Sequence, residues 1–427
     1  MKLKELKGKR LLVLGFGKEG RDTFSFLRSA FPKAEIGISD EKEELAQLPA
    51  DTELHLGKKY LEAIRQYDVV FKSPGIPTKV LESYLGEKHT LTSQTELFLS
   101  EYPGTIIGVT GTKGKSTTSA LIHRVLKAGG KKTNLAGNIG EPVLSYLERA
   151  NKEDLFVYEL SSFQLELVET SPHIAVFLNL YPEHLDHHES FEKYAAAKEN
   201  ITRFQTTNDI LLFNEKDFQV NEIASRSKAK KMGYDPGERR PQEKFIASPV
   251  PAVLVGELFG ISSQVVEEAI QTFQPLPHRL ERIGEWKGIE FVNDSLSTIP
   301  QSTMAAMEAL RGTVGTLILG GTDRGIPFEP LSKAVLEHKI ATLVLFPDTG
   351  RKIRELVERE ATGQGRKPPC MVEANSMEEA VAACFAATPQ GKVCLLSPAS
   401  PSFRMFRDYR ERGERFASLA ATYGKNT

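Results

Sequence analysis

The chain has 427 residues, 40% of them hydrophobic and 26% charged, which is the composition of a soluble globular protein. At roughly 150 residues per domain, this length predicts about three domains. The 55 Lys and Arg residues nearly balance the 56 Asp and Glu residues, giving a formal net charge of −1. A dedicated nucleic-acid binder would show a basic excess, which this chain lacks. A membrane helix would need about 20 consecutive apolar residues, and no apolar stretch of the sequence approaches that length. We therefore expect a cytoplasmic protein that binds neither nucleic acid nor membrane.

The cysteines carry little information about function. Cys370, Cys384 and Cys394 show neither CxxC spacing nor a pairing framework. Neither a disulfide scaffold nor a structural zinc site is therefore expected.

The first part of the chain predicts a strand at residues 11–15, followed by a helix. Apolar residues at spacings of three and four mark one face of that helix. Further strands are predicted at residues 35–39 and 68–71. Short apolar runs that alternate with amphipathic stretches are typical of parallel sheets covered by helices, so the fold class is α/β.

A glycine motif follows the first predicted strand. Gly15, Gly17 and Gly20 form a GxGxxG pattern, and Asp40 ends the next strand. This matches the dinucleotide-binding fingerprint, in which the acid holds a ribose hydroxyl. A merely structural tight turn accounts for the glycines equally well.

A second phosphate-binding motif follows a strand predicted at residues 105–109. The segment Gly111–Thr117 reads GTKGKST and opens an apolar helix. Glycines let backbone N–H groups approach phosphate oxygens, Lys115 can reach the terminal phosphates, and the Ser116 hydroxyl can bind Mg²⁺. The alternative is a glycine-rich turn with chance lysines. Two phosphate sites favour a nucleotide-bearing substrate in the first domain and ATP in the second.

Strands predicted at residues 155–160 and 174–180 continue this second domain. Glu159 lies at the end of the first of them, where a carboxylate suits Mg²⁺, although it could equally be a turn acid. Three histidines, His184, His187 and His188, follow the second strand. Without a nearby cysteine we expect one of them to be functional and two to be solvated. Lys198, taken alone, is a surface lysine on a helix.

The third part of the chain predicts another α/β unit, with strands at residues 289–293, 314–320, 340–346 and 392–396. Residues 226–251 precede it and are interpreted as an irregular connection. A proline-rich linker at residues 274–277 suggests a boundary. Polar loops at the carboxyl ends of these strands are expected to meet at one crevice. The predicted domains are therefore residues 1–95, 96–276 and 277–427.

These motifs together resemble the Mur ligase family. The segments that carry the resemblance, in family order, are GTKGKSTT at 111–118, GNIG at 137–140, YELSSFQLE at 158–166, the segment from His184 to Lys198, PHRLE at 277–281, NDS at 293–295, GGTDRG at 320–325 and SPASPSF at 397–403. The resemblance implies a Rossmann-like N-terminal domain, a central P-loop ATP-binding domain and a Rossmann-like C-terminal domain. The first domain, with its GFGKEG and SPGIP segments, resembles that of the branch that adds D-glutamate.

The resemblance also implies a reaction and its site residues. ATP phosphorylates the carboxylate of UDP-N-acetylmuramoyl-L-alanine, and the amino group of glutamate attacks the acyl phosphate, a step in cytoplasmic peptidoglycan precursor synthesis. The implied catalytic residues are Lys115, Glu159, His184 and Lys198. Ser116 and Glu159 would hold one Mg²⁺ and His184 a second, with Lys198 carbamylated into a further metal ligand. No partner beyond these substrates is implied, and we expect a monomer.

The resemblance assigns the remaining contacts as follows. ATP is implied to contact Gly111, Thr112, Lys113, Gly114, Lys115, Ser116, Thr117, Arg279, Asp294 and Asp323. The UDP-linked substrate is implied to contact Gly15, Phe16, Gly17, Lys18, Asp40, Ser73, Pro74, Gly75 and Asn138. The incoming amino acid is implied to contact Thr298, Arg324, Ser402, Phe403 and Tyr409.

Two departures from the family pattern leave alternatives open. Leu296 stands where the family has a lysine expected to pair with the incoming glutamate, so Arg324, Arg404 or Arg407 would have to compensate. Residues 248–252 replace a segment that usually contacts adenine. A related ligase that adds L-glutamate is the first alternative. A Rossmann-type oxidoreductase and a nucleotide-binding regulator without catalysis are more remote ones.

Overall fold

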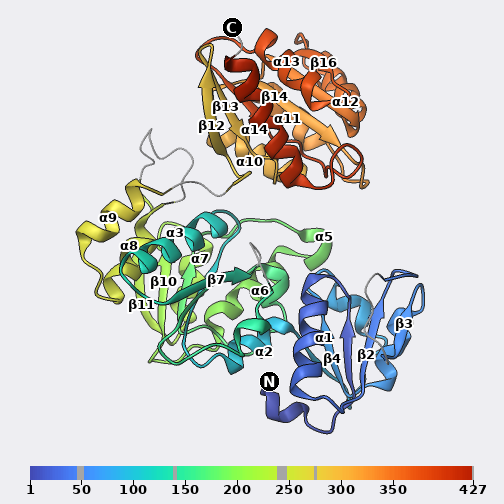
Figure 1. Ribbon diagram of the computed structural model, residues 1–427, viewed down its shortest axis with the longest axis vertical. Coiled ribbons are helices and arrows are strands. Elements are labelled where there is room, and N and C mark those ends of the chain that lie inside the picture. The colour runs from blue at the N-terminus through green and yellow to red at the C-terminus, as the bar shows by residue number, and fades with distance from the viewer. Residues whose placement is uncertain (46–51, 138–141, 238–247, 274–276, 426–427) are drawn as a thin grey trace. The chain divides into compact units, whose positions relative to one another are not determined.

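The computed structural model describes residues 1–45, 52–137, 142–237, 248–273 and 277–425 (Figure 1). It forms two compact units, which are described separately below. The first comprises Met1–Glu238 and Ala247–Phe273, and the second contains Gln274–Thr427. The predicted boundary at residue 95 lies within helix α2 (Gln94–Glu101), and the boundary at residue 276 falls outside the described residues. The three domain limits therefore stay predictions.

The first unit begins with a parallel sheet in the order β3-β2-β1-β4-β5. Its strands are β1 (Leu11–Leu14), β2 (Ile36–Asp40), β3 (Leu54–Leu56), β4 (Val69–Lys72) and β5 (Thr90–Thr92). Alternate residues of β1 point to opposite faces, and both faces are covered. Helix α1 (Lys18–Ala30) buries Phe24 and Leu27 on one face. The other face packs on the 3₁₀ helix η2 (Tyr60–Gln66). Two more 3₁₀ helices are η1 (Leu3–Leu6) and η3 (Thr78–Leu81).

The second sheet of this unit is also parallel, in the order β11-β10-β9-β6-β8-β7. Its strands are β6 (Thr105–Thr110), β7 (Thr133–Gly137), β8 (Leu155–Glu159), β9 (Ile174–Phe177), β10 (Ile210–Asn214) and β11 (Lys230–Tyr234). After β6 the chain builds one side of the sheet and then crosses to the other. Ligands bind beside the carboxyl ends of strands at such a switch point.

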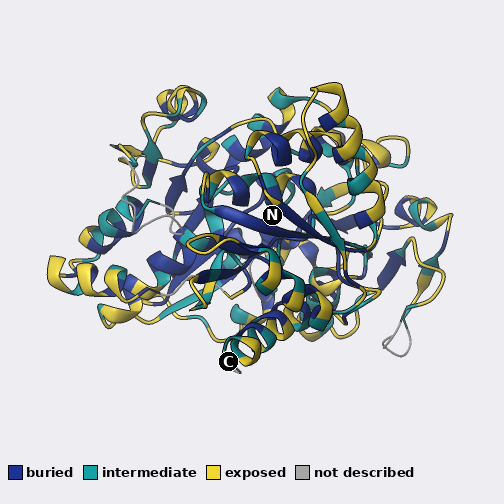
Figure 2. Ribbon diagram, turned by 90° about the horizontal axis from the view of Figure 1, so that it is seen from above, coloured by how far each residue is buried: buried dark blue, intermediate teal, exposed yellow. Residues whose placement is uncertain are grey.

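Helices cover this second sheet, and a short one follows each of two central strands. They are α2, α3 (Lys115–Ala128), η4 (Leu144–Tyr146), α4 (Ser162–Leu165), α5 (Leu185–His188), α6 (Phe191–Arg203), α7 (Phe218–Arg226), α8 (Val250–Leu258) and α9 (Ser263–Gln271). The central strands β6, β8 and β9 are buried, whereas the edge strands β7 and β11 are partly exposed. Many of the other exposed residues lie in helices and loops (Figure 2).

The second unit contains a six-stranded sheet in the order β12-β13-β17-β14-β15-β16, with β12 antiparallel to β13 and the other pairs parallel. Its strands are β12 (Glu281–Trp286), β13 (Ile289–Asn293), β14 (Val314–Gly321), β15 (Thr342–Asp348), β16 (Cys370–Glu373) and β17 (Val393–Leu396). Its helices are α10 (Pro300–Ala309), α11 (Glu329–Glu337), α12 (Thr349–Gly363), α13 (Met377–Ala387) and α14 (Tyr409–Lys425). Leu317 and Ile318 face separate apolar cores on the two sides of this sheet.

The predicted α/β class is confirmed, and each strand predicted from the sequence is present in the structure. The prediction for residues 226–251 was wrong in part, because β11 and the first turn of α8 lie within them. All three cysteines are free thiols. Across the described parts of the chain, no helix is both long and apolar enough to span a membrane.

Candidate active site

The loops that follow β1 and β4 are tied together by hydrogen bonds. Gly15 has a φ of +89°, and its carbonyl accepts a hydrogen bond from the Ser73 hydroxyl at 2.8 Å. The Phe16 N–H donates to Asp40 at 2.7 Å, so this carboxylate holds the backbone of the glycine loop. An added Cβ at Gly20 would lie 2.0 Å from the Gly15 carbonyl oxygen, which excludes any side chain there.

The other predicted residues of the UDP-substrate site lie in or beside these loops. Gly17 and Lys18 are exposed, and Pro74 and Gly75 follow Ser73 directly. Asn138, also predicted to contact this substrate, lies outside the described residues.

The loop between β6 and α3 has the geometry of a phosphate cradle. Gly111 and Gly114 have φ values of +156° and +87°, and Gly114 is the residue that precedes α3. Asn179, two residues beyond β9, holds the loop through two hydrogen bonds to Lys113. Its Oδ1 accepts from the Lys113 N–H at 2.8 Å, and its Nδ2 donates to the Lys113 carbonyl at 3.0 Å. The N-terminus of α3 therefore adjoins this loop, and an anion binds favourably at such a helix N-terminus.

Two residues at the start of α3 carry the predicted phosphate and metal contacts. The Lys115 ammonium folds back over the loop and donates to the carbonyls of Gly111 (2.9 Å) and Thr112 (3.2 Å). Ser116 is 1% exposed. Two further predicted contacts are close by. Thr117 lies in the first turn of α3, and Lys113 lies in the loop before it and forms an ion pair with Glu183.

Lys198 is not the surface lysine that its sequence context suggested. It lies on the inner face of α6, is 1% exposed, and its Nζ donates to the Gly111 carbonyl at 2.9 Å. Burial and the neighbouring Lys115 hold the pKa of Lys198 well below its usual range. This shift favours the neutral, nucleophilic amine more than at an exposed lysine.

Glu159 and His184 lie around the same loop. Glu159 ends β8, is fully buried, and interacts electrostatically with Lys198. His184 precedes α5 in a left-handed conformation, with φ +56° and ψ 36°. Burial lowers its pKa, and the nearby lysines 115, 198 and 113 add to that effect while Glu183 opposes it. The structure thus gathers the predicted catalytic residues at the carboxyl ends of β6, β8 and β9.

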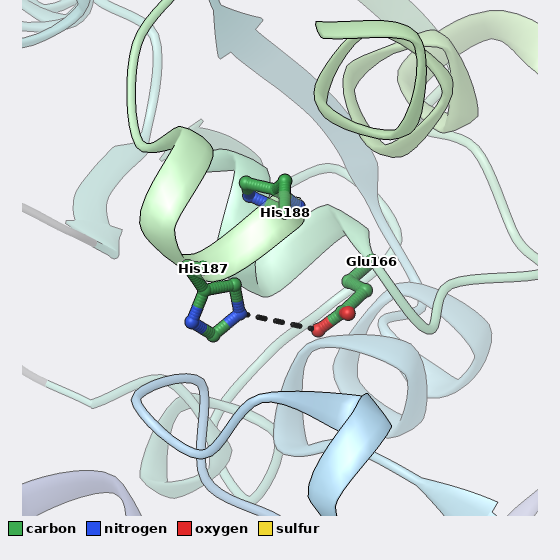
Figure 3. Close-up of side chains that lie close together, drawn as sticks. All are labelled: Glu166, His187 and His188. Carbon is green, nitrogen blue, oxygen red and sulfur yellow. Dashed lines mark ion pairs between the residues drawn. The ribbon is translucent and has the colours of Figure 1, made fainter. Parts of the chain in front are cut away.

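The sequence predicted that two of the three histidines are solvated, but His188 is buried. His188 is 4% exposed, stacks on Phe163, and its Nε2 lies 3.0 Å from the Ser162 hydroxyl. Burial lowers the pKa of His188 to about 4. His187 Nε2 lies 3.7 Å from Glu166 Oε2 (Figure 3).

Glu166, His187 and His188 place ligand atoms within 4.8 Å of one another, a spacing from which a metal could draw them together. The Lys72 ammonium, however, lies 3.0 Å from Glu166 Oε2 and already balances that carboxylate. A resident cation in this place disfavours a second one.

In the second unit, the predicted ATP-facing residues Arg279 and Asp294 interact electrostatically with each other. Asp294 is 3% exposed and accepts from the Ser397 hydroxyl at 2.7 Å and from the Leu280 N–H at 3.2 Å. Burial raises its pKa to about 6. The buried Nε of Arg279 has no hydrogen-bond partner among the described residues.

The predicted amino-acid contacts fall into two groups within this unit. Arg324 lies over the ring of Phe403 at 5.5 Å, and Phe403 is 60% exposed. Ser402 lines a small pocket together with the glycines that end β14. Tyr409 belongs instead to the region of Asp294, since its carbonyl accepts from Ser295 and its ring meets His278.

Other residues of the second unit bear on the predicted contacts. Asp323, a predicted ATP contact, forms an ion pair with Lys352. Arg404 is paired with Asp348 at 2.7 Å. Leu296 and Thr298 are half-buried.

Sequence reasoning missed two side chains that organise these loops. Tyr194 lies 3.0 Å from the Thr112 hydroxyl, and its ring centroid is 5.1 Å from Lys198 Nζ. Arg412 is fully buried and donates to the Ser295 hydroxyl (2.9 Å), the Ser295 carbonyl (2.8 Å) and the Ser400 carbonyl (2.9 Å). A usable signal existed for Arg412, because it shares its helical spacing with the buried Phe416 and Ala420.

The fold and this loop geometry define a class of protein: a multi-domain α/β enzyme with a phosphate-binding loop. Comparison with known proteins makes this specific. The family model of the Mur ligase middle domain matches residues 109–267, and that described as "Mur ligase, glutamate ligase domain" matches residues 278–400. The UDP-N-acetylmuramoylalanine–D-glutamate ligases of Acetivibrio thermocellus and Koribacter versatilis are each 34% identical to this chain. The matches cover 97% of this chain, and 97% and 98% of the relatives respectively.

Solved structures show the same architecture at low sequence identity. The MurF ligase of Thermotoga maritima, solved in complex with ADP, matches with a TM-score of 0.57 and 16% identity, covering 99% of this chain and 97% of that one. The UDP-N-acetylmuramate-alanine ligase MurC of the same organism matches with a TM-score of 0.55 and 17% identity, covering 97% and 100%. The chain belongs to the Mur ligase family and is an ATP-dependent ligase that forms an amide bond.

Proposed function

We propose that this enzyme adds D-glutamate to UDP-N-acetylmuramoyl-L-alanine at the expense of ATP, as a step of peptidoglycan precursor synthesis. The observation that carries the proposal is the convergence of Lys115, Glu159, His184 and Lys198 around Gly111. Full-length relatives at 34% identity that bear the name of this activity support the choice of substrate.

ATP is proposed to bind at the loop 111–117. Its phosphates would accept from the N–H groups at the start of α3 and from Lys115, whose ammonium would leave the loop carbonyls for the nucleotide. The predicted ATP contacts of the second unit, Arg279, Asp294 and Asp323, are part of the same proposal.

The donors around this loop fit Mg²⁺. Ser116 offers a hydroxyl oxygen and Glu159 a carboxylate, which are the hard ligands that Mg²⁺ takes beside phosphate oxygens. Magnesium, when bound, neutralises charge that develops on the transferring phosphoryl group. Two ions are proposed, the second near His184.

Lys198 is proposed to become the other ligand of the second ion. An ammonium cannot bind a metal, but a neutral amine adds CO₂ to give a carbamate and releases one proton. Its complete burial and its lowered pKa support this step.

The reaction is proposed to proceed through two displacements. The substrate carboxylate attacks the γ-phosphorus of ATP, ADP leaves, and an acyl phosphate forms. The neutral amino group of glutamate then attacks the acyl carbon, phosphate leaves, and the amide nitrogen loses its extra proton. The UDP part would lie at the loops of Gly15 and Ser73. Glutamate would lie near Arg324, Phe403 and Ser402, with Thr298 and Tyr409 as further predicted contacts.

A ligation assay tests the proposal. Phosphate release should require ATP, UDP-N-acetylmuramoyl-L-alanine and D-glutamate together, and ATP turnover indifferent to both co-substrates would refute it. L-glutamate in the same assay tests the alternative, which the half-buried, apolar Leu296 keeps open. NAD(P)H binding measured by fluorescence tests the oxidoreductase alternative, for which we expect no signal.

A further inference from the structure

Glu166 lies between three parts of the first unit. It follows α4 directly, and α4 in turn begins three residues after Glu159 on the same short segment. Its Oε2 accepts from the Lys72 ammonium at 3.0 Å. The same oxygen lies 3.7 Å from His187, one turn after His184 (Figure 3). One carboxylate thus touches the segments that carry two proposed metal ligands.

Lys72 connects this carboxylate to the proposed UDP-substrate loops. It ends β4 and is 3% exposed. Besides Glu166, its Nζ donates to the Ile76 carbonyl at 2.7 Å and so holds the loop that begins at Ser73. Ser73 is bonded to Gly15, so the two loops form one hydrogen-bonded unit.

A second link runs in parallel to the first. Glu19, in the first turn of α1, accepts from Gln164 Nε2 at 2.9 Å. Gln164 Oε1 accepts from the Ser161 N–H at 3.1 Å, which fixes the chain just beyond Glu159. Glu19 and Lys72 also interact electrostatically. Each proposed substrate loop therefore sends one charged side chain to the same short segment.

Both links are buried or half-buried, which makes them stiff. Breaking one partner of a buried pair leaves the other charge without compensation, so such a pair keeps one arrangement or changes as a unit. A chain of paired side chains with discrete arrangements is what couples two binding sites. A ligand that displaces the 73–77 loop would move Lys72 and with it Glu166. The shift of Glu166 would in turn displace the segments that carry Glu159 and His184.

We propose that Lys72 and Glu166 are positioning residues that couple binding of the UDP-linked substrate to binding of magnesium nucleotide at the loop 111–117. Neither residue touches a reacting atom in this proposal. The inference rests on the proposed function, because it takes the ligand of the first loops to be the UDP-linked substrate.

Equilibrium binding tests the coupling without turnover. The Kd of UDP-N-acetylmuramoyl-L-alanine is measured by calorimetry with and without Mg²⁺ and a non-hydrolysable ATP analogue. In the wild type we expect the nucleotide to change this Kd by at least about fivefold. K72M and E166Q should each reduce this ratio by at least about twofold, with the remainder carried by the Glu19–Gln164 link, and the double variant should match the single ones because both residues belong to one link.

A more exposed ion pair, next to the first residue of β8, serves as a control. Lys132 pairs with Asp154 at 2.8 Å, just before β8 begins, at the opposite end from Glu159. K132M should keep the wild-type ratio. Thermal unfolding of each variant verifies that it is folded, and E166Q, which keeps the side-chain shape, decides the matter if K72M does not fold.

The outcomes separate this inference from the proposed function. A folded E166Q with an unchanged ratio overturns the inference, as does a wild-type ratio of one. An enzyme that shows the coupling but does not ligate D-glutamate refutes the proposed reaction alone. One that ligates D-glutamate without coupling refutes the inference alone.

Discussion

The lysines around the proposed phosphate and UDP-substrate loops of the first unit are held differently from Arg324 of the second unit. In the first unit, Lys72 and Lys198 are buried and bonded to carbonyl or carboxylate oxygens, and Lys115 lies folded over its own loop. In the second unit, Arg324 is exposed and rests on the equally exposed ring of Phe403.

This difference follows from the charge that each site is proposed to receive. A nucleoside triphosphate brings several negative charges, which compensate the ammonium group of Lys115, so the phosphate loop can be built in advance. Prebuilt donors cost no reorganisation at the moment of reaction. A single amino acid brings less binding energy, and an exposed arginine can remain solvated until it arrives. The comparison predicts that removing Lys115 or Lys198 lowers activity more than removing Arg324.

The largest expected effect is that of K115A. Loss of the ammonium removes a donor to the transferring phosphoryl group, so we expect kcat/KM to fall by about 10²–10³-fold. Steady-state phosphate release measures it. Lys127 lies in the last turn of the same helix and is exposed, and K127A should retain wild-type kinetics. A loss of less than about tenfold in kcat/KM for K115A would refute the claim that Lys115 matters more for activity than Arg324.

K198A should follow, with kcat reduced by about 10–100-fold, the loss that is typical even when only a hydrogen-bonding partner of a metal ligand is removed. Acetate or another short carboxylic acid should restore part of the activity by replacing the carbamate. K198R supplies the contrast, because a guanidinium fills the cavity yet forms no carbamate, so acid should not rescue it. Wild-type activity in K198A refutes the role assigned to this lysine.

The fold and the phosphate loop could be predicted from the sequence because their signals are local. Each signal lies within a single short segment: the glycine spacing in one loop, the apolar run in β6 and the helical periodicity in α1. The pairing of Lys72 with Glu166 spans 94 residues, and no local pattern reports it. The burial of Lys198 was missed for the same reason: helical spacing shows which residues share a face but not what covers that face.

Short strands were missed for a different reason. β3 and β5 have three residues each and retain partly exposed side chains, so neither alternation nor a buried run marks them. Their pairing with β2 and β4 is decided by tertiary contacts.

Asp294 is expected to affect stability rather than rate. Burial raises the pKa of this carboxyl to about 6, above its unfolded value. Below about pH 4 both states are protonated and the group contributes nothing. As pH rises through the window from about 4 to 6, the unfolded state ionises more readily, so the folded state loses up to about 3 kcal/mol relative to it.

D294N should therefore gain stability relative to the wild type over that window and keep a constant difference above it. Calorimetric unfolding of the full chain at several pH values measures this. D323N is the opposing control: the pKa of Asp323 is lowered by Lys352, so wild-type stability from this exposed pair is lost as pH falls. Equal slopes for both variants would show that burial of Asp294 is not the cause.

The smallest effect on catalysis is expected from changes at Arg324, which test the second half of the comparison. R324M removes an exposed cation that is proposed to meet the side-chain carboxylate of glutamate. One solvated charge-assisted hydrogen bond is worth about 1.5 kcal/mol, so the KM for D-glutamate should rise about tenfold while the KM for ATP stays unchanged. F403A should raise it less, since an exposed cation–π contact contributes only about 0.5–1 kcal/mol.

R404M is the matched control for Arg324, because the Arg404 guanidinium is already paired with Asp348. Should R404M raise the KM for glutamate more than R324M does, Arg404 would be the residue that compensates for Leu296. That ion pair would then have to open on binding. In that case Arg404 would leave Asp348 to bind glutamate, as Lys115 is proposed to leave its loop carbonyls to bind ATP. The two units would then differ only in how deeply these side chains are buried.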